Sequence, residues 1–170
     1  MFDRAVPEDP SVVDRTVVLV LAPNEGLVSY FPVIRAVTRR PAPARIRLLA
    51  SATSATLVER TGARTLVVTP ESGLLSTTAE RMLRSKTLPF AAGDRVTTPG
   101  MTAHVEAITS DGRPQRVRFD FDVDLDHPSL LWLRWDVLGF VPWTPPAVGE
   151  RETLAGFDVA AALDAALERG

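Results

Sequence analysis

The longest alternation of apolar and charged residues in the chain lies between Arg116 and Asp126. A period of two is typical of a β-strand with one buried face and one solvated face. The apolar face holds Val117, Phe119, Phe121, Val123 and Leu125, and the charged face holds Arg116, Arg118, Asp120, Asp122, Asp124 and Asp126. The pattern predicts a strand over residues 115–124.

A second pattern is the uninterrupted apolar or β-branched run TVVLVLA at residues 16–22. Such a run cannot alternate between core and water, so it predicts a strand inside the sheet that is buried on both faces. Shorter runs between turn residues predict further strands at 45–50, 56–60, 64–69, 94–98, 102–109, 130–135, 140–143 and 150–154. Thr61–Ala63 and Asp111–Gly112 are typical hairpin turns.

Helical spacing is weaker and is confined to three segments. Residues 25–39 form an amphipathic helix whose predicted inner stripe is Leu27, Tyr30, Phe31, Ile34 and Val37. Pro32 requires either a helix that begins with Ser29 as its N-cap or a kink. Residues 77–84 suit one or two helical turns, and residues 157–168 suit a helix.

These elements predict an α+β, mainly β fold: a β-barrel or sandwich of short antiparallel strands with two or three peripheral helices. Residues 1–14, with two prolines among charges, are expected to be a flexible leader. Residues 15–154 are expected to form a single β-rich domain, with a weaker boundary near 86–93. Residues 155–170 complete the chain as the C-terminal helix.

Composition changes the picture mainly by exclusion. The chain has 170 residues, a formal net charge of −2 and no cysteine, which argues against nucleic-acid binding and excludes thiol chemistry. The N-terminal sequence does not resemble a signal peptide, and the apolar run at 16–22 is far shorter than the about 20 residues that span a bilayer. A cytoplasmic location, at the membrane face if the partner is a membrane protein, is therefore expected.

The sequence contains none of the familiar catalytic motifs that would indicate a known reaction. The sequence contains no nucleophile elbow, phosphate-binding loop, zinc-protease motif or dinucleotide-binding motif. The two histidines, His104 and His127, are predicted in a strand and a turn, and their spacing does not indicate a metal site. We expect no cofactor, and the chain looks more like a binding protein than an enzyme.

The acidic side of residues 115–126 is the candidate metal site. Asp120, Asp122, Asp124 and Asp126 offer the oxygen ligands that Ca²⁺ prefers. However, residues two apart in a strand are separated by about 6.7 Å, too far for one ion to take neighbouring side chains. The favoured interpretation is a solvated strand face balanced by Arg116, Arg118 or a cross-strand Arg134.

The candidate partner-binding residues come from two other segments. The basic run consists of Arg35, Arg39, Arg40, Arg45 and Arg47. We expect it to be a solvated helix end and linker, to contact the acidic strand or a partner, or to contact an anionic membrane surface. In the strand over 130–135, the period of two places Leu131, Leu133 and Trp135 in the core. Trp132 and Arg134 then share the polar face, beside Asp120 or Asp122 if the two strands pair, and form a typical hot-spot pair.

Three stretches together carry a resemblance: residues 15–36, residues 93–135 with DGRP, HPSL and LRW, and GFVPWTPPAVGE at 139–150. They resemble the C-terminal soluble region of large uncharacterised bacterial proteins whose N-terminal part is a bundle of membrane-spanning helices. No activity or site residue is attached to that region. This chain lacks the membrane part and adds a C-terminal helix, so we expect an excised domain or a free-standing relative.

The resemblance implies a non-enzymatic accessory or interaction domain associated with a membrane protein or another protein partner. The alternative is a small-molecule-binding barrel, or an enzyme of unfamiliar type, that uses the acidic strand and the cluster of Trp132, Trp135 and Trp143. A cavity of roughly 300 Å³ or more, lined by Trp and Asp, favours the alternative, whereas a filled core favours the interaction domain.

Overall fold

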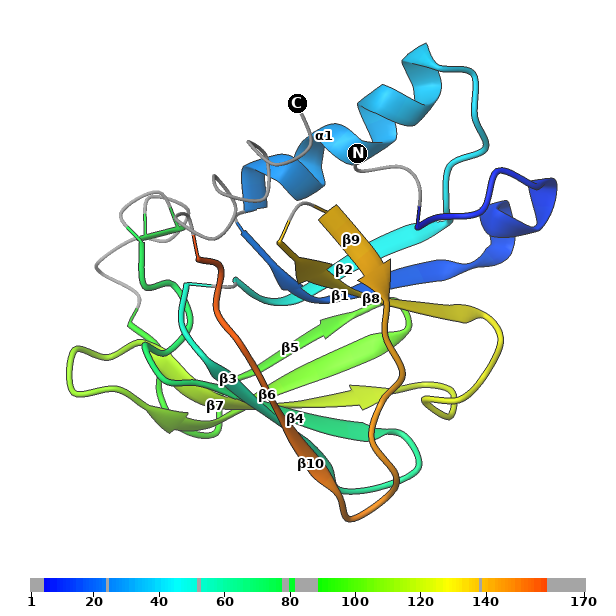
Figure 1. The fold of residues 1–170 in the computed structure, drawn as a ribbon. Helices are drawn as coiled ribbons and strands as arrows, with labels where there is room; N and C mark the ends of the chain where they lie inside the picture. The colour runs from blue at the N-terminus through cyan, green and yellow to red at the C-terminus, as the bar shows by residue number, and fades with distance from the viewer. Residues whose placement is uncertain are drawn as a thin grey trace. The chain divides into compact units, whose positions relative to one another are not determined.

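The computed structural model describes residues 5–23, 25–51, 53–77, 80–81, 89–137 and 139–158. Within these residues the fold is mainly β, as predicted: ten strands form two sheets (Figure 1). The helical elements are α1 (Glu25–Val37), the 3-10 helix η1 (Pro10–Asp14) and the two described residues Glu80 and Arg81. The prediction of a C-terminal helix falls mostly on residues 159–170, which lie outside the described part of the chain.

The contacts of the chain divide it into two compact units. The first contains residues 1–52, 128–144 and 156–170, and the second contains residues 53–127 and 145–155. The strand pattern of the sequence predicts one domain over 15–154 instead. Its weaker boundary at 86–93 falls partly outside the described residues, and 89–93 belong to the second unit.

The first unit is built on a four-stranded sheet with the order β2-β1-β8-β9. Its strands are β1 (Thr16–Ala22), β2 (Arg45–Ser51), β8 (Leu130–Asp136) and β9 (Gly139–Pro142). β1 runs parallel to both β2 and β8, so the prediction of antiparallel strands is wrong for most of this sheet. The prediction for residues 16–22 is confirmed, because every residue of β1 after Thr16 is buried, as in a parallel strand covered on both faces.

α1 lies across one face of this sheet and forms the first unit's core with it (Figure 1). Phe31 of α1 packs in a cluster with residues of β1, β8 and β9, namely Val17, Leu19, Ala22, Leu133 and Phe140. Val6 and Val12 join the same cluster. The expectation of a flexible leader is therefore wrong for residues 5–14, because burial of these two valines ties the segment to the core.

The second unit is a six-stranded sheet in which all neighbours are antiparallel, with the order β10-β3-β4-β7-β6-β5. Its strands are β3 (Thr56–Arg60), β4 (Thr65–Pro70), β5 (Arg95–Thr98), β6 (Met101–Ile108), β7 (Pro114–Phe121) and β10 (Arg151–Leu154). Among the described residues β10 and β5 are the edges of this sheet, which is therefore open. Both predicted hairpins are confirmed, joining β3 to β4 and β6 to β7.

The turn between β6 and β7 shows why the Asp-Gly pair is a reliable signal. Gly112 has a φ of 78°, a conformation that glycine adopts without steric cost. Asp111 accepts hydrogen bonds from Arg113 Nε at 2.8 Å and from the Thr109 hydroxyl. The Arg113 bond, followed by the Thr109 bond, lowers the pKa of Asp111 to about 2.

Candidate functional site

The four aspartates of the predicted metal site do not share one strand. β7 ends at Phe121, so only Asp120 lies in it, and the other three follow in a loop. The Asp120 carboxylate lies 3.1 Å from His104 Nε2 and 3.2 Å from Arg118 Nε, and it accepts a hydrogen bond from the Thr65 hydroxyl at 2.9 Å. Asp120 is thus contacted by one side chain of its own strand, Arg118, and by one from each neighbouring strand, Thr65 of β4 and His104 of β6.

Two loop aspartates bind arginines of the second unit. Asp124 pairs with Arg64 at 2.9 Å, and Asp126 binds both terminal nitrogens of Arg60, at 2.9 and 2.5 Å. No group of three or more acidic or histidine side chains suited to a metal ion occurs among the described residues. Asp120, Asp124 and Asp126 are therefore better explained as partners of basic side chains. The predicted partner Arg118 contacts Asp120, whereas the partners Arg60 and Arg64 were not predicted.

Arg60 is a buried structural arginine that connects separate segments. Besides Asp126, its guanidinium donates to the carbonyl oxygen of Pro146 at 3.3 Å, and its backbone pairs with Gly149 and Glu150. The hydrogen bond with Asp126 raises the pKa of Arg60, and the same bond lowers the pKa of Asp126. The pair thus stabilises the fold of the second unit.

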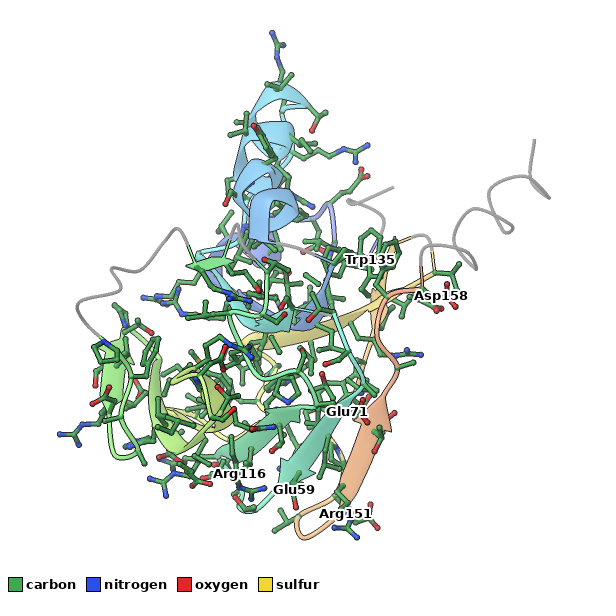
Figure 2. The ribbon with its side chains drawn as sticks, turned by 90° about the vertical axis from the view of Figure 1, so that its left-hand side faces the viewer. Glu59, Glu71, Arg116, Trp135, Arg151 and Asp158 are labelled. Carbon is green, nitrogen blue, oxygen red and sulfur yellow. The ribbon has the colours of Figure 1, made fainter. Side chains whose placement is uncertain are left out.

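A ladder of ion pairs crosses one face of the second sheet. Arg116 contacts Glu59 at 2.5 Å, and the two side chains lie side by side in Figure 2. Arg116 also contacts Glu106 at 3.0 Å, and Arg118 lies 3.7 Å from Glu106. The pKa of Arg116 is raised, first by its hydrogen bond with Glu59. All four side chains remain between 21% and 39% exposed, so the ladder is a solvated network of modest energy.

The tryptophans and Arg134 do not form the predicted surface. β8 pairs with β1 and β9, so its predicted pairing with residues 115–124 is wrong. Trp132 is only 6% exposed and packs edge to face with Trp143 at 5.7 Å, whereas Trp135 is half-buried. Trp132 therefore does not provide the exposed half of a hot-spot pair with Arg134.

Trp135 packs with other aromatic side chains of the first unit. It makes edge-to-face contacts with Phe140 at 5.0 Å and with Phe157 at 6.2 Å. Trp132 and Trp143 form the separate pair described above. Among the described residues, the three tryptophans thus take part in three aromatic contacts, one between Trp132 and Trp143 and two made by Trp135.

The first unit contains a small cavity, which bears on the possibility of a ligand site. It lies between α1 and the sheet and has a volume of about 10 Å³. Its walls are entirely aliphatic or phenylalanine side chains: Val6, Val17, Leu19, Val28, Phe31, Ile46, Leu133 and Phe140. This volume is far below the roughly 300 Å³ of a small ligand site, and the described residues of its lining include no Trp or Asp.

The first arginine of the basic run is not a surface residue. Arg35 is fully buried, and its guanidinium donates to the carbonyl oxygens of Pro41, Pro7 and Val6. The guanidinium carbon also lies 5.6 Å from the ring centre of Phe31. The prediction that Arg35 contacts a partner is therefore wrong, because it requires a side chain at the surface. The buried Arg35 side chain instead joins α1 to the segments before and after it.

The remaining arginines of the run lie nearer to solvent. Arg39 and Arg45 are exposed, and Arg40 is half-buried with an ion pair to Glu8 at 3.3 Å. Arg47 is half-buried, and its pKa is lowered, first by burial and then by the charge of Arg45. Positive charge is therefore available beyond the C-terminal end of α1.

α1 is rotated from the orientation that its predicted inner stripe requires. Phe31 faces the core, but Tyr30, Val33, Ile34 and Val37 are 66%, 55%, 38% and 78% exposed. The side chain of Leu27 lies outside the described part of the chain. We name Tyr30, Val33, Ile34 and Val37 the outward face of α1.

The outward face has no charged residue beside it on the helix. Between residues 26 and 38 the sequence contains a single charged residue, and that residue is the buried Arg35. An exposed helix of a globular protein normally places charged side chains on its outer surface. The sequence already indicated that α1 would expose apolar side chains. Val28 and Val33 lie outside the predicted inner stripe, so the helix is apolar on several sides.

None of the helices in the described ranges combines the length and the hydropathy that a bilayer crossing requires. Comparison of the chain with models of protein families, with curated proteins and with solved structures finds no match.

Proposed function

We propose that this chain is a non-enzymatic interaction domain that binds its partner through the outward face of α1. The observation that carries the proposal is the exposure of Tyr30, Val33 and Val37 on a helix without an exposed charged side chain from residue 26 to residue 38. Contiguous exposed apolar surface of this kind marks interaction sites in soluble proteins.

The aspartates that the sequence offered as a candidate metal site have structural roles, which supports the same proposal. Asp120, Asp124 and Asp126 are engaged with basic side chains, and the cavity under α1 is too small for a ligand. Within the described residues, these contacts favour the interaction domain over the alternative of a small-molecule-binding barrel or an enzyme built on the Trp cluster and the acidic strand. The resemblance to soluble regions of polytopic membrane proteins supports a partner at a membrane.

Site-specific photo-crosslinking in the cells that make the full chain tests the proposal. A photoreactive amino acid at Val37 should form protein or lipid adducts, whereas the same amino acid at Val148 should not. Val148 is a matched control because it is a valine that is 57% exposed in the second unit. Adding Val33→Asp should abolish the adducts at position 37. Equal adduct yields at positions 37 and 148 would contradict an interaction site on α1.

A further inference from the structure

We infer that the outward face of α1 lies on an anionic lipid surface, with its apolar side chains among the acyl chains and the arginines beyond its end against the headgroups. This inference rests on the proposed function and names the occupant of the same face.

The charged residues of the sequence from residue 26 to residue 58 all have one sign, although Glu25 begins α1 and Glu8 pairs with Arg40. No acidic residue occurs between Glu25 and Glu59, and five arginines lie in that interval. Of these, Arg39 and Arg45 are exposed, whereas Arg35 is buried inside the unit. A segment that is only apolar, neutral and cationic complements a negatively charged surface, and basic residues near an anionic leaflet gain electrostatic energy.

The position of Arg39 supports the inference independently. Its φ is 56°, the left-handed conformation that glycine normally supplies where a helix ends. The backbone amide of Arg40 donates to the carbonyl oxygen of Arg35 at 2.9 Å and closes the helix end around this residue. An arginine is therefore held at a backbone position that disfavours it, where its charge immediately follows the outward face.

The apolar side chains match an interfacial helix better than a spanning one. α1 has 13 residues, so it extends for about 20 Å, less than the hydrocarbon thickness of a bilayer. A tyrosine and three aliphatic side chains occupy its exposed side, and helices of this type lie in the plane of the membrane with the apolar face buried. Tyrosine is enriched at that boundary because its ring is apolar and its hydroxyl is polar.

Co-sedimentation of the purified full chain with lipid vesicles tests the inference. Vesicles of phosphatidylcholine with about one third phosphatidylglycerol are compared with phosphatidylcholine alone, at low salt and at high salt. We expect binding to the anionic vesicles that high salt weakens, and much weaker binding to the neutral vesicles. Val33→Asp combined with Val37→Asp should lower the partition coefficient by about tenfold or more, because it places two charges in the apolar contact.

Two substitutions separate electrostatics from folding. Arg39→Gly should lower the partition coefficient by about fivefold while retaining the helix end, since glycine suits the left-handed backbone. Arg39→Lys should retain most of the binding. Arg151→Ala and Val148→Asp, at exposed positions of the second unit, serve as matched controls and should leave binding unchanged. Tryptophan fluorescence and circular dichroism check that each variant is folded.

The outcomes distinguish this inference from the proposed function. Binding that the aspartate substitutions do not change, or equal binding to neutral and anionic vesicles, would overturn the lipid assignment. If vesicle binding is absent while position 37 crosslinks to a protein, the interaction site stands and its occupant is a protein. Concentration-dependent self-association that Val33→Asp removes would identify a second copy as the occupant. Loss of both vesicle binding and selective crosslinking would overturn both.

Discussion

The buried guanidinium of Arg35 provides the sharpest test of how the first unit is held together. Arg35→Met keeps an unbranched side chain of similar length but removes every nitrogen donor. In the structure these donors serve the carbonyl oxygens of Val6, Pro7 and Pro41, so one side chain connects residues before β1, α1 itself and the segment that leads to β2. We expect the substitution to destabilise the first unit substantially.

The magnitude follows from the geometry of the three contacts. A hydrogen bond from a charged donor contributes about 1.5–3 kcal/mol, and a buried carbonyl without a donor costs about 1–3 kcal/mol. The bond to Val6 is long, at 3.4 Å, whereas that to Pro7 is short, at 2.6 Å. Methionine avoids the desolvation cost of a buried charge, which offsets part of the loss. The expected decrease in the free energy of unfolding is about 2–4 kcal/mol.

Urea denaturation followed by tryptophan fluorescence measures this decrease. All three tryptophans, Trp132, Trp135 and Trp143, lie in the first unit, so the signal reports on that unit. Arg45→Met is the matched control, because it makes the same chemical change at an exposed position of β2 in the same unit. Surface substitutions of this kind usually change the free energy of unfolding by less than about 0.5 kcal/mol.

The reasoning would be refuted if Arg35→Met and Arg45→Met had the same effect within error. A gain in stability for Arg35→Met would also refute it, because the desolvation cost of the arginine would then exceed the value of its hydrogen bonds. In either case the contacts with Val6, Pro7 and Pro41 would not stabilise the unit.

Three further predictions concern both units. Trp132→Ala should cost about 3–5 kcal/mol, the usual penalty for truncating a buried large side chain, and more than Trp135→Ala; denaturation curves of the two variants decide the order. Arg60→Lys should lower the free energy of unfolding of the second unit by about 1–2 kcal/mol, since lysine cannot bind Asp126 through two nitrogens, and circular dichroism against urea should show it. The pKa of Asp111 is lowered from 3.8 to about 2 in the folded chain, so its contribution is present above about pH 4 and is lost as the pH falls towards 2. Asp111→Asn should therefore reduce the slope of stability against pH in that window, and an unchanged slope would show that the hairpin contact does not persist in solution.

The position of nearly every strand could be predicted because a strand is a local pattern. The run at residues 16–22 matches β1, and the bounds of β3 match the prediction for residues 56–60. Side chains of a strand alternate between two faces or are buried on both, and either pattern is visible in a few consecutive residues. Turn chemistry is equally local, as the Asp111–Gly112 hairpin shows.

Pairing between distant strands could not be predicted from the same patterns. The strand at residues 130–135 pairs with β1, far away in the sequence, and not with the acidic strand that precedes it. An apolar run fits a neighbour on either side, because backbone hydrogen bonds carry no sequence information. The correct partner strand follows from the packing of the whole unit. Because β8 pairs with β1 and β9, Trp132 is buried and not exposed.

The sequence by itself determined the strands, the turns and the absence of an acidic residue between Glu25 and Glu59. Only the tertiary structure decided which side of α1 faces outward. Helical spacing predicted that Tyr30, Ile34 and Val37 face the core and that Arg35 faces water. The structure reverses this, because carbonyl groups brought together from either side of α1 satisfy the Arg35 guanidinium. A charged group can be buried when hydrogen-bond acceptors surround it, and the carbonyl groups that surround Arg35 are close together only in the folded chain.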